Sequence, residues 1–221
     1  MNEKARIGNK VSRLRTDDRG RIDLKSMDRG ELERFVVDEL GQTAIRGRNV
    51  FQWLWQKGAR TFAEMDSVNG PLRRLLEERC YISFLEPDLI LKSEDGTVKY
   101  VWKLHDGHQI ESVLIPEENR TTLCMSSQVG CAMACTFCLT GDLGLKRHLT
   151  ASEIANQAMQ VQRQLPDGER ITNLVFMGMG EPLHNLPNLI PALEICLDDF
   201  ALKFSHRRVT VSTVGLVPKM A

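Results

Sequence analysis

After Pro116 the chain alternates between strand-like and helix-like segments, and this alternation limits the possible folds more than any other feature of the sequence. The segments follow one another in the order TTLCMS, a helix from about Thr150, ITNLVFM, a helix from about Leu186, and RRVTVST. Strands that alternate with helices in this way are typical of βα units on a parallel sheet or barrel. We therefore expect an α/β fold for residues 117–221.

The part of the chain before Pro116 has a different pattern. From about Asp28 to Cys80 apolar residues recur at helical spacing, and the stretch SEDGTVKYVWKLHDGHQIESVLIP then alternates in the manner of strands. Its two Asp-Gly pairs, at 95–96 and 106–107, predict the turns of a small antiparallel meander. We expect three parts, namely a basic, flexible arm (1–27), a small α+β accessory domain of helices followed by a β-meander (28–116), and the α/β part (117–221).

Composition excludes several classes of protein. Of the 221 residues 42% are hydrophobic, no apolar run is long enough to cross a bilayer, and the N-terminus lacks the apolar core of a secretion signal. We therefore expect a cytoplasmic protein, in whose reducing environment clustered cysteines indicate metal or redox chemistry rather than structural disulfides. Cys80 and Cys196 stand apart from the cluster, and we expect them to be small buried hydrophobic residues.

Charge by itself does not indicate a nucleic-acid partner, because the formal net charge is zero. Basic residues are nevertheless grouped in three places, and most groups of this kind are solvated surface. They are the N-terminal arm (Lys4, Arg6, Lys10, Arg13, Arg15), a cluster after the cysteines (Lys146, Arg147, His148) and a cluster before the last strand (His206, Arg207, Arg208). Contact with RNA stays open on this evidence.

Four of the six cysteines lie close together in CMSSQVGCAMACTFC. Cys131, Cys135 and Cys138 have the spacing C-x3-C-x2-C, and three thiolates on one loop can hold three corners of a four-iron cluster and leave the fourth iron open. Two other interpretations remain. Cys135 and Cys138 alone form a redox pair, and Cys124 could complete a four-cysteine zinc site. A redox pair has no use for Cys131, and structural zinc usually takes two tight pairs, so the spacing favours the cluster.

The segment GMGEP, residues 178–182, follows the strand-like ITNLVFM and so lies at the end of a strand where α/β barrels build their sites. Gly178 and Gly180 would let the backbone approach a ligand closely, and Glu181 offers an acceptor to an ammonium group. Alone, such a loop is more often a tight turn. After a three-cysteine loop on the preceding strand, it resembles the S-adenosylmethionine (SAM) pocket of radical SAM enzymes.

Longer stretches of the chain resemble the dual-specificity ribosomal and transfer RNA adenine C2 methyltransferases, the RlmN family of radical SAM enzymes. The stretches are RGRNVFQWLWQKGARTFAEM, SEDGTVKYVW, IESVLIPEENRTTLCMSSQVGCAMACTFC, LVFMGMGEPLHN and RRVTVSTVGLVP. The resemblance implies an α/β fold, a radical SAM partial (βα) barrel that is truncated here and preceded by a small α+β accessory domain that helps to hold RNA.

The resemblance also implies two cofactors, a [4Fe-4S] cluster and S-adenosylmethionine. The implied cluster ligands are Cys131, Cys135 and Cys138, and the implied contacts to S-adenosylmethionine are Gly180, Glu181 and Ser212. Glu111 matches the position of the family's proton acceptor. Cys124 matches the cysteine that forms a transient disulfide with a methyl-carrying cysteine near the C-terminus.

The implied chemistry explains why these residues belong together. Adenine C2 is an electron-poor carbon with no lone pair, so it cannot simply displace a sulfonium methyl. In the family's route one S-adenosylmethionine methylates the C-terminal cysteine, and a second is cleaved to a 5′-deoxyadenosyl radical that takes hydrogen from this methyl. The carbon radical adds to C2, a base removes the C2 proton, and Cys124 frees the product by forming a disulfide.

No cysteine after Cys196 can match the methyl-carrying residue. We therefore expect the chain to be an N-terminal portion of such an enzyme, unable to methylate RNA by itself. In a truncated barrel the strand RRVTVST would be an open edge, with unpaired backbone groups that favour aggregation.

The resemblance implies the partners as well. The substrates would be 23S ribosomal RNA at the peptidyl transferase centre and transfer RNA at an anticodon-loop adenosine, with an electron donor such as flavodoxin or ferredoxin, no membrane, and a monomeric enzyme. Two alternatives remain open, namely the antibiotic-resistance branch that methylates adenine C8, and a metal-containing RNA-binding module without catalysis. GEP at 180–182 and IPEENR at 115–120 favour the C2 enzyme weakly.

Strand alternation adds an expectation for the two catalytic candidates. In TTLCMSS, Cys124 shares a face with Thr122 and Ser126, while Leu123 and Met125 share the other face. A purely structural thiol would more often lie on the side of the leucine and the methionine. In IESVLIP, Glu111 shares its face with two apolar residues, Val113 and Ile115, which suits a base.

Overall fold

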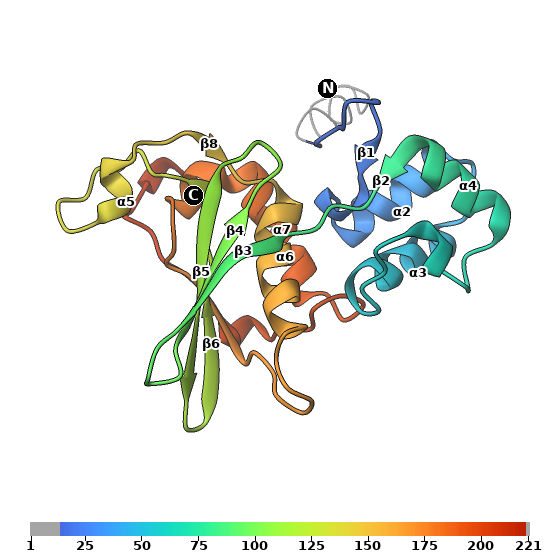
Figure 1. The fold of residues 1–221 in the computed structure, drawn as a ribbon. Helices are drawn as coiled ribbons and strands as arrows, with labels where there is room; N and C mark the ends of the chain where they lie inside the picture. Colours follow the sequence, from blue (N-terminus) through green and yellow to red (C-terminus); the bar gives the residue numbers. More distant parts are fainter. Residues whose placement is uncertain (1–13, 220–221) are drawn as a thin grey trace. The chain divides into compact units, whose positions relative to one another are not determined.

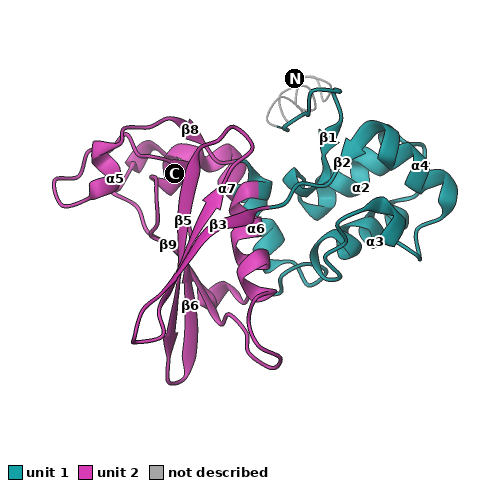
Figure 2. Ribbon diagram, viewed as in Figure 1, with its two compact units in different colours: residues 1–84, 150–152, 190–203 teal, residues 85–149, 153–189, 204–221 magenta. Residues whose placement is uncertain are grey.

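The computed structural model describes residues 14–219, and it divides them into two compact units (Figures 1 and 2). Unit 1 comprises the described residues up to 84 together with 150–152 and 190–203, and unit 2 comprises 85–149, 153–189 and the residues from 204. Each unit is described by itself below.

Unit 1 is mainly helical. Its elements are β1 (Ile22–Asp23), η1 (Leu24–Ser26), α2 (Arg29–Asp38), α3 (Ala44–Trp55), η2 (Phe62–Glu64), α4 (Gly70–Arg79), β2 (Cys80–Tyr81) and the later part of α7 (Leu186–Leu197). Helix α2 begins at a capping box, in which the Asp28 carboxylate accepts a hydrogen bond from the Glu31 N–H and the Glu31 carboxylate accepts one from the Asp28 N–H. The Asn69 side chain caps α4 in a similar way, by accepting from the Leu72 N–H at 3.0 Å.

Residues 22–27 are folded, which corrects the expectation of a flexible arm as far as residue 27. Strand β1 pairs in parallel with β2, and all three residues of η1 are buried. The Lys25 ammonium lies over the ring of Trp55, 4.4 Å from its centroid, and over the ring of Phe84 at 5.0 Å. This cation–π contact and the burial around it hold the segment in place. The other basic residues of the expected arm, namely Lys4, Arg6, Lys10 and Arg13, lie outside the described residues.

Unit 2 is built on a six-stranded sheet with the order β10-β9-β6-β5-β4-β3. The strands are β3 (Glu86–Lys92), β4 (Val98–Lys103), β5 (Gln109–Glu117), β6 (Arg120–Cys124), β9 (Asn173–Phe176) and β10 (Val209–Val211). The pairs β6–β9 and β9–β10 are parallel, whereas β3–β4, β4–β5 and β5–β6 are antiparallel. The three parallel strands confirm the α/β part that the alternating pattern predicted.

Shorter elements complete unit 2. They are β7 (Gln128–Val129), α5 (Leu139–Asp142), β8 (Arg147–His148), α6 (Ala151–Gln162, from its third residue on), η3 (Pro182–Asn185), the start of α7, η4 (His206–Arg208) and η5 (Val217–Lys219). Strands β7 and β8 form a separate antiparallel pair. Strand β10 is at one end of the order given above, so the predicted edge position of RRVTVST is confirmed within the described residues.

The meander belongs to the large sheet, so the compact units differ from the division expected after Pro116. Strand β5 continues to Glu117 and pairs with both β4 and β6. The change of unit falls instead between residues 84 and 85. The two turns of the meander are where the sequence predicts them, at Asp95-Gly96 and Asp106-Gly107.

Helix α6 packs against one face of the sheet (Figure 1). Gln157 on α6 accepts hydrogen bonds from the Ser112 hydroxyl on β5 and from the Ser126 N–H, each at 2.8 Å. The sheet residues on this face are buried, and they are Ile110, Ser112, Leu114, Leu123, Leu174 and Phe176. The residues between them, which include Glu111 and Cys124, are half-buried and point to the opposite face.

The helices are short. Helices α3, α6 and α7 each have 12 residues, and α7 continues through Pro191. Within residues 14–219 no helix is both long enough and apolar enough to cross a membrane.

Arg147 is part of a buried ion pair and not of a solvated basic cluster. Its guanidinium binds both carboxylate oxygens of Glu153, at 2.8 and 2.9 Å, and it also pairs with Asp106. Burial alone would raise the pKa of Asp106, but the hydrogen bonds from Arg147 and from the His108 N–H, together with the charge of Arg147, lower the pKa to about 2. The charged partners come from the meander turn and from α6, so Arg147 joins segments that are distant in sequence.

Replacing Arg147 by Met is expected to reduce the free energy of unfolding by about 3 kcal/mol, because the buried carboxylate of Glu153 would lose the guanidinium that binds both of its oxygens. Glu153 is 4% exposed. Urea denaturation at pH 7 measures the loss. The control is Arg120→Ala, which removes an exposed pair with Glu117 and should cost at most about 1 kcal/mol. Similar losses for the two variants would contradict this account of Arg147.

Candidate active site

The three parallel strands end at the same edge of the sheet, and the loops that follow them are joined there by hydrogen bonds. Strand β6 leads to the cysteine segment, β9 to the GMGEP loop (178–182) and β10 to residues 212–214. The Gly178 N–H donates to the Met125 carbonyl at 3.1 Å, and the Val214 N–H donates to the Glu181 carboxylate at 2.9 Å. The carboxyl ends of parallel strands are where α/β proteins build their sites.

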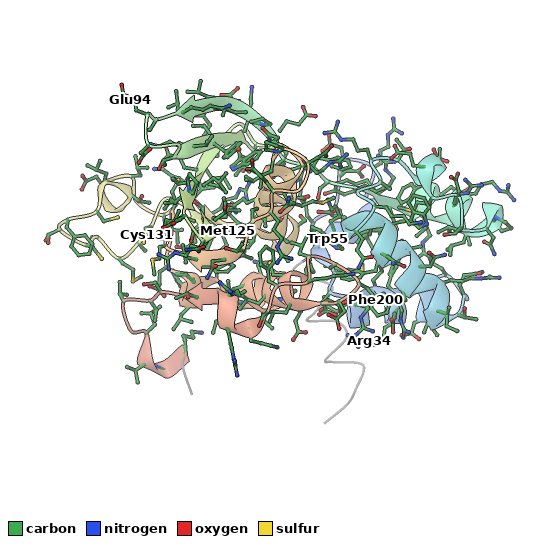
Figure 3. The ribbon with its side chains drawn as sticks, turned by 90° about the horizontal axis from the view of Figure 1, so that it is seen from below. Arg34, Trp55, Glu94, Met125, Cys131 and Phe200 are labelled. Atoms are coloured by element: carbon green, nitrogen blue, oxygen red, sulfur yellow. The ribbon has the colours of Figure 1, made fainter. Side chains whose placement is uncertain are left out.

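The loop that carries the three clustered cysteines is shaped by tight turns. The Cys138 N–H donates to the Cys135 carbonyl at 3.0 Å, and Ala134, which directly precedes Cys135, has a positive φ of 47°. The Met133 N–H is directed at the sulfur of Cys131, 3.5 Å away. Figure 3 shows Cys131 at the base of this loop, with Met125 on the segment that leads to it.

Cys131, Cys135 and Cys138 are free and half-buried, and they share the loop without converging on one point. Among residues 14–219 no three His, Cys, Asp or Glu side chains are arranged as a metal-binding group. The argument that the loop fits an iron–sulfur cluster therefore rests on the kind and number of ligand atoms that the loop provides. Three accessible sulfurs on one short loop, with no imidazole or carboxylate between them, are the ligands that such a cluster uses.

The GMGEP loop lies directly on residues 125–128, and its two glycines make this approach possible. A Cβ atom on Gly178 would be 2.8 Å from the carbonyl oxygen of Met125. A Cβ atom on Gly180, which has a φ of 103°, would be 2.5 Å from the Cβ of Gln128. Any larger residue would push the loop away. The two glycines thus allow the GMGEP loop to pack against residues 125–128 of the same chain. The sequence pattern alone had indicated a close approach to a ligand instead.

Glu181 connects the loop after β9 to the loop after β10. Its side chain is buried, and Oε1 accepts hydrogen bonds from the Leu183 N–H (3.0 Å) and the Thr213 hydroxyl (2.6 Å). Oε2 accepts from the Val214 N–H. A carboxylate has about four acceptor positions, so one remains for a ligand. Ser212, the neighbour of Thr213, is exposed at the same edge.

Gln128 and Thr213 are part of this edge although the sequence analysis did not single them out. Gln128 is fully buried and its amide bonds the backbone N–H of Glu181 at 2.8 Å. Neither residue belongs to a spacing motif. The only signal is adjacency, since Gln128 precedes the cysteine loop by three residues and Thr213 follows Ser212.

Glu111 and Cys124 lie on the same face of the sheet. Val113 on β5 and Val175 on β9 are the neighbours of Cys124 across the two strand pairs. Glu111 is two residues from Val113 and therefore shares its face, diagonally from Cys124, a separation of about 7–8 Å between Cα atoms. The predicted alternation is confirmed where it can be compared directly, because Leu123 is completely buried while Cys124 is half-buried.

The cysteines outside the cysteine loop differ in how strongly burial raises the pKa of their thiols. Burial raises the pKa of Cys80 and of Cys196 to about 12, so both are inert, as expected of small buried hydrophobic residues. Burial also raises the pKa of Cys124, and a hydrogen bond with the Met177 backbone opposes this effect. Cys124 is therefore a protonated thiol at neutral pH that stays partly accessible.

Glu111 is less enclosed than its apolar neighbours suggested. Val113 and Ile115 share its face, but its side chain is 45% exposed and its carboxylate lies 3.4 Å from the ammonium nitrogen of Lys99 on β4. Lys99 is an additional residue beside this candidate base. The carboxylate is therefore accessible, as a proton acceptor must be.

Comparison with known proteins identifies the class to which this arrangement belongs. A model of the radical SAM superfamily matches residues 125–221, which contain both loops described above. The structure of a radical SAM methyltransferase from Sphaerobacter thermophilus is similar, with a TM-score of 0.79 and 37% identity over 89% of this chain and 58% of that one. The α/β sheet and its three-cysteine loop are thus those of a radical SAM protein.

The rest of the chain indicates which proteins of this class it is similar to. A model described as the ribosomal RNA large subunit methyltransferase N-terminal domain matches residues 22–82. The dual-specificity RNA methyltransferase RlmN of Geobacter sulfurreducens is 56% identical over 90% of this chain and 54% of its own length, and that of Pelobacter propionicus is 52% identical over 90% and 56%. Over about 90% of its length the chain is therefore similar to RlmN proteins, which is the family it resembles. It spans about half the length of the curated relatives it matches.

The similarity to radical SAM proteins supports two cofactors, a [4Fe-4S] cluster and S-adenosylmethionine. The three sulfurs on the loop after β6 fit the first, as argued above. Gly180, Glu181 and Ser212 lie in the loops that follow β9 and β10, at the same edge of the sheet as the cysteine segment.

Proposed function

We propose that the protein to which this chain belongs methylates carbon 2 of adenines in 23S ribosomal RNA and in transfer RNA. The observation that carries the proposal is the shared edge of β6, β9 and β10, where a three-cysteine loop and the GMGEP loop meet beside Glu111 and Cys124. The relatives named as dual-specificity RNA methyltransferases support the substrate class. In this proposal the methyl-carrying cysteine belongs to the part of the relatives that the chain does not span.

Each residue of the edge has a proposed part in holding the cofactors. Cys131, Cys135 and Cys138 bind three irons of the cluster and leave one iron open. The cluster and S-adenosylmethionine, when bound, supply a 5′-deoxyadenosyl radical by reductive cleavage of the sulfonium. Glu181 presents its remaining acceptor position, and Ser212 its exposed hydroxyl, to the polar groups of S-adenosylmethionine.

Glu111 and Cys124 act on the adenine and on its link to the enzyme. The Glu111 carboxylate, which lies 3.4 Å from the Lys99 ammonium, accepts the proton that leaves C2. The Cys124 thiol loses its proton and its sulfur attacks the sulfur of the methyl-carrying cysteine. The S–S bond forms as the S–C bond to the added carbon breaks, and this carbon keeps the bonding electrons and takes up a proton to become the methyl group on C2. Both groups lie on the face of the sheet away from α6, which is the interior side of a partial barrel.

Several partners follow from the proposed reaction. An RNA substrate needs basic contacts, and Lys146 and the exposed η4 residues His206, Arg207 and Arg208 are available for them. Reduction of the cluster requires a one-electron donor such as flavodoxin or ferredoxin. We further propose a monomer that acts in the cytoplasm, where ribosomal and transfer RNA are found.

The test uses an extended protein, in which this chain is fused to the C-terminal part of the Geobacter sulfurreducens relative. With reductant, S-adenosylmethionine and unmodified ribosomal RNA, this protein is expected to produce 2-methyladenosine, detected by mass spectrometry after digestion. The same protein with Cys135→Ala is the control and should give none. Formation of 8-methyladenosine instead would place the chain in the antibiotic-resistance branch, and no methylated adenine at all would contradict the proposal.

In the same extended protein, Glu111→Gln is expected to slow formation of 2-methyladenosine by about 100-fold or more, because general-base catalysis contributes factors of this size. Release of 5′-deoxyadenosine should continue, since hydrogen abstraction precedes loss of the C2 proton. Chromatography of both products in one reaction measures the two steps. A parallel loss of both products would show that Glu111 is not the base.

A further inference from the structure

Gln128 is fully buried between the cysteine loop and the GMGEP loop, and the reaction proposed above gives it no part. Its Oε1 accepts a hydrogen bond from the Glu181 N–H at 2.8 Å. Because a backbone N–H can only donate, this bond determines which end of the amide is oxygen and which is nitrogen. Nε2 is therefore the donor, and it lies 2.8 Å from Nδ1 of His148 and 3.4 Å from Nδ1 of His184.

The two histidines act as acceptors for the same amide group. For both Nδ1 atoms to accept, both imidazoles must be neutral, with their protons on Nε2. The surroundings favour this state for His148, since burial lowers its pKa and a positive charge on His184, whose ring centroid is 5.0 Å away, would lower it further. The nearest charged group on the same strand is Arg147, whose guanidinium bonds the His148 carbonyl and Glu153.

The aliphatic part of the Gln128 side chain, Cβ and Cγ, also holds the GMGEP loop in place, in addition to the amide group. A Cβ atom on Gly180 would be 2.5 Å from Cβ and 2.7 Å from Cγ of Gln128, so the turn at Gly180 rests on this side chain. The backbone N–H of Gln128 also donates to the Met179 carbonyl at 3.1 Å. One residue thus fixes three consecutive positions of the GMGEP loop, Met179, Gly180 and Glu181.

We propose that Gln128 is a positioning residue, which fixes the GMGEP loop for S-adenosylmethionine through its bond to the Glu181 N–H and is itself oriented by two neutral histidines, His148 and His184. The inference rests on the proposed function, because it takes the GMGEP loop as part of the S-adenosylmethionine site. Gln128 also lies on β7, three residues before Cys131, so it couples the position of this loop to the start of the cysteine loop.

The test replaces Gln128 by Met, which keeps the length of the stem and removes both ends of the amide. In the reconstituted 221-residue chain, titration calorimetry is expected to show S-adenosylmethionine binding weakened by about 10-fold to 100-fold, the range that loss of a buried hydrogen-bonded group spans. The iron content should be unchanged, because no cluster ligand is altered.

The matched control is Gln157→Met. Gln157 is equally buried, but its hydrogen bonds go to Ser112, Ser126 and Glu153 and not to the GMGEP loop. It should lower the urea midpoint about as much as Gln128→Met while affinity for S-adenosylmethionine stays within about twofold. Equal losses of affinity in both variants, or no loss in either, would overturn the inference. If the unmodified chain with its cluster does not bind S-adenosylmethionine, the proposed function fails and this inference with it.

A second measurement needs no variant. Nitrogen-15 NMR of the histidines in the unmodified chain distinguishes a protonated Nδ1 from an unprotonated one. We expect Nδ1 of both His148 and His184 to be unprotonated at neutral pH, as acceptors for the Gln128 amide. A protonated Nδ1 on both rings would leave the amide without acceptors and would overturn the orientation on which the proposal depends.

Discussion

Alanine at any one of Cys131, Cys135 or Cys138 is expected to abolish cluster binding. After anaerobic reconstitution the unmodified chain should take up about four irons and show the broad sulfur-to-iron absorption of a [4Fe-4S] cluster, and each variant should lose both. The physical reason is the number of ligands. The loop supplies three thiolates and no other group of the right kind, so two remaining sulfurs cannot retain the cluster.

The controls for this experiment come from the other cysteines. Cys196 is completely buried with a pKa of about 12, and Cys124 lies on β6, outside the cysteine loop. Cys196→Ala and Cys124→Ala should therefore keep the full iron content. Uptake of one zinc and no iron by the unmodified chain would contradict the cluster, as would an iron content that survives Cys135→Ala.

The second large effect is expected for Cys124→Ala in the extended protein described above. Without the resolving sulfur, the bond between the methyl-carrying cysteine and adenine C2 has no thiol to break it, so the protein should remain covalently attached to its RNA. Denaturing electrophoresis with labelled RNA would show a slowly migrating complex that protease digestion removes. Turnover should fall to the level of a single event per protein.

Cys80→Ala is the matched control, because it removes a thiol that is buried and unreactive. It should turn over repeatedly and leave no complex. Repeated turnover by Cys124→Ala would show that another group releases the product, and the role proposed for Cys124 would be withdrawn.

The parts of the fold that depend on neighbouring residues could be predicted from the sequence. The turns at Asp95-Gly96 and Asp106-Gly107 and the alternation of Leu123 and Cys124 rest on local backbone preferences, and the structure confirms them. The joining of the meander to the parallel strands depends on the β5–β6 pair, which no local pattern specifies. The division expected after Pro116 therefore differs from the observed one.

The residues that sequence analysis misread act through distant partners. Arg147 looked like surface charge because its partners, Asp106 and Glu153, come from another turn and another helix. Lys25 was placed in a flexible arm, although the rings of Trp55 and Phe84 enclose it. In each case the charge is visible in the sequence, but the group that compensates it is brought near only by the fold.

The candidate site likewise contains residues that the sequence predicts and residues that it does not. The cysteine spacing and GMGEP are short motifs whose chemistry can be stated from residue types, and the strand ends do bring the two loops together. Gln128 could not be found like this. Its importance comes from one bond to Glu181 and from contact with Gly180, residues more than fifty positions away in sequence.

The most direct test of the central claim is reductive cleavage of S-adenosylmethionine by the reconstituted 221-residue chain. Incubated with dithionite and S-adenosylmethionine under anaerobic conditions, the chain is expected to form 5′-deoxyadenosine and methionine in equal amounts, and Cys135→Ala is expected to form neither. Quantification by liquid chromatography and mass spectrometry gives the result without any RNA substrate. An iron-loaded chain that binds S-adenosylmethionine but yields no 5′-deoxyadenosine above the Cys135→Ala background would contradict a radical SAM site on these three strands.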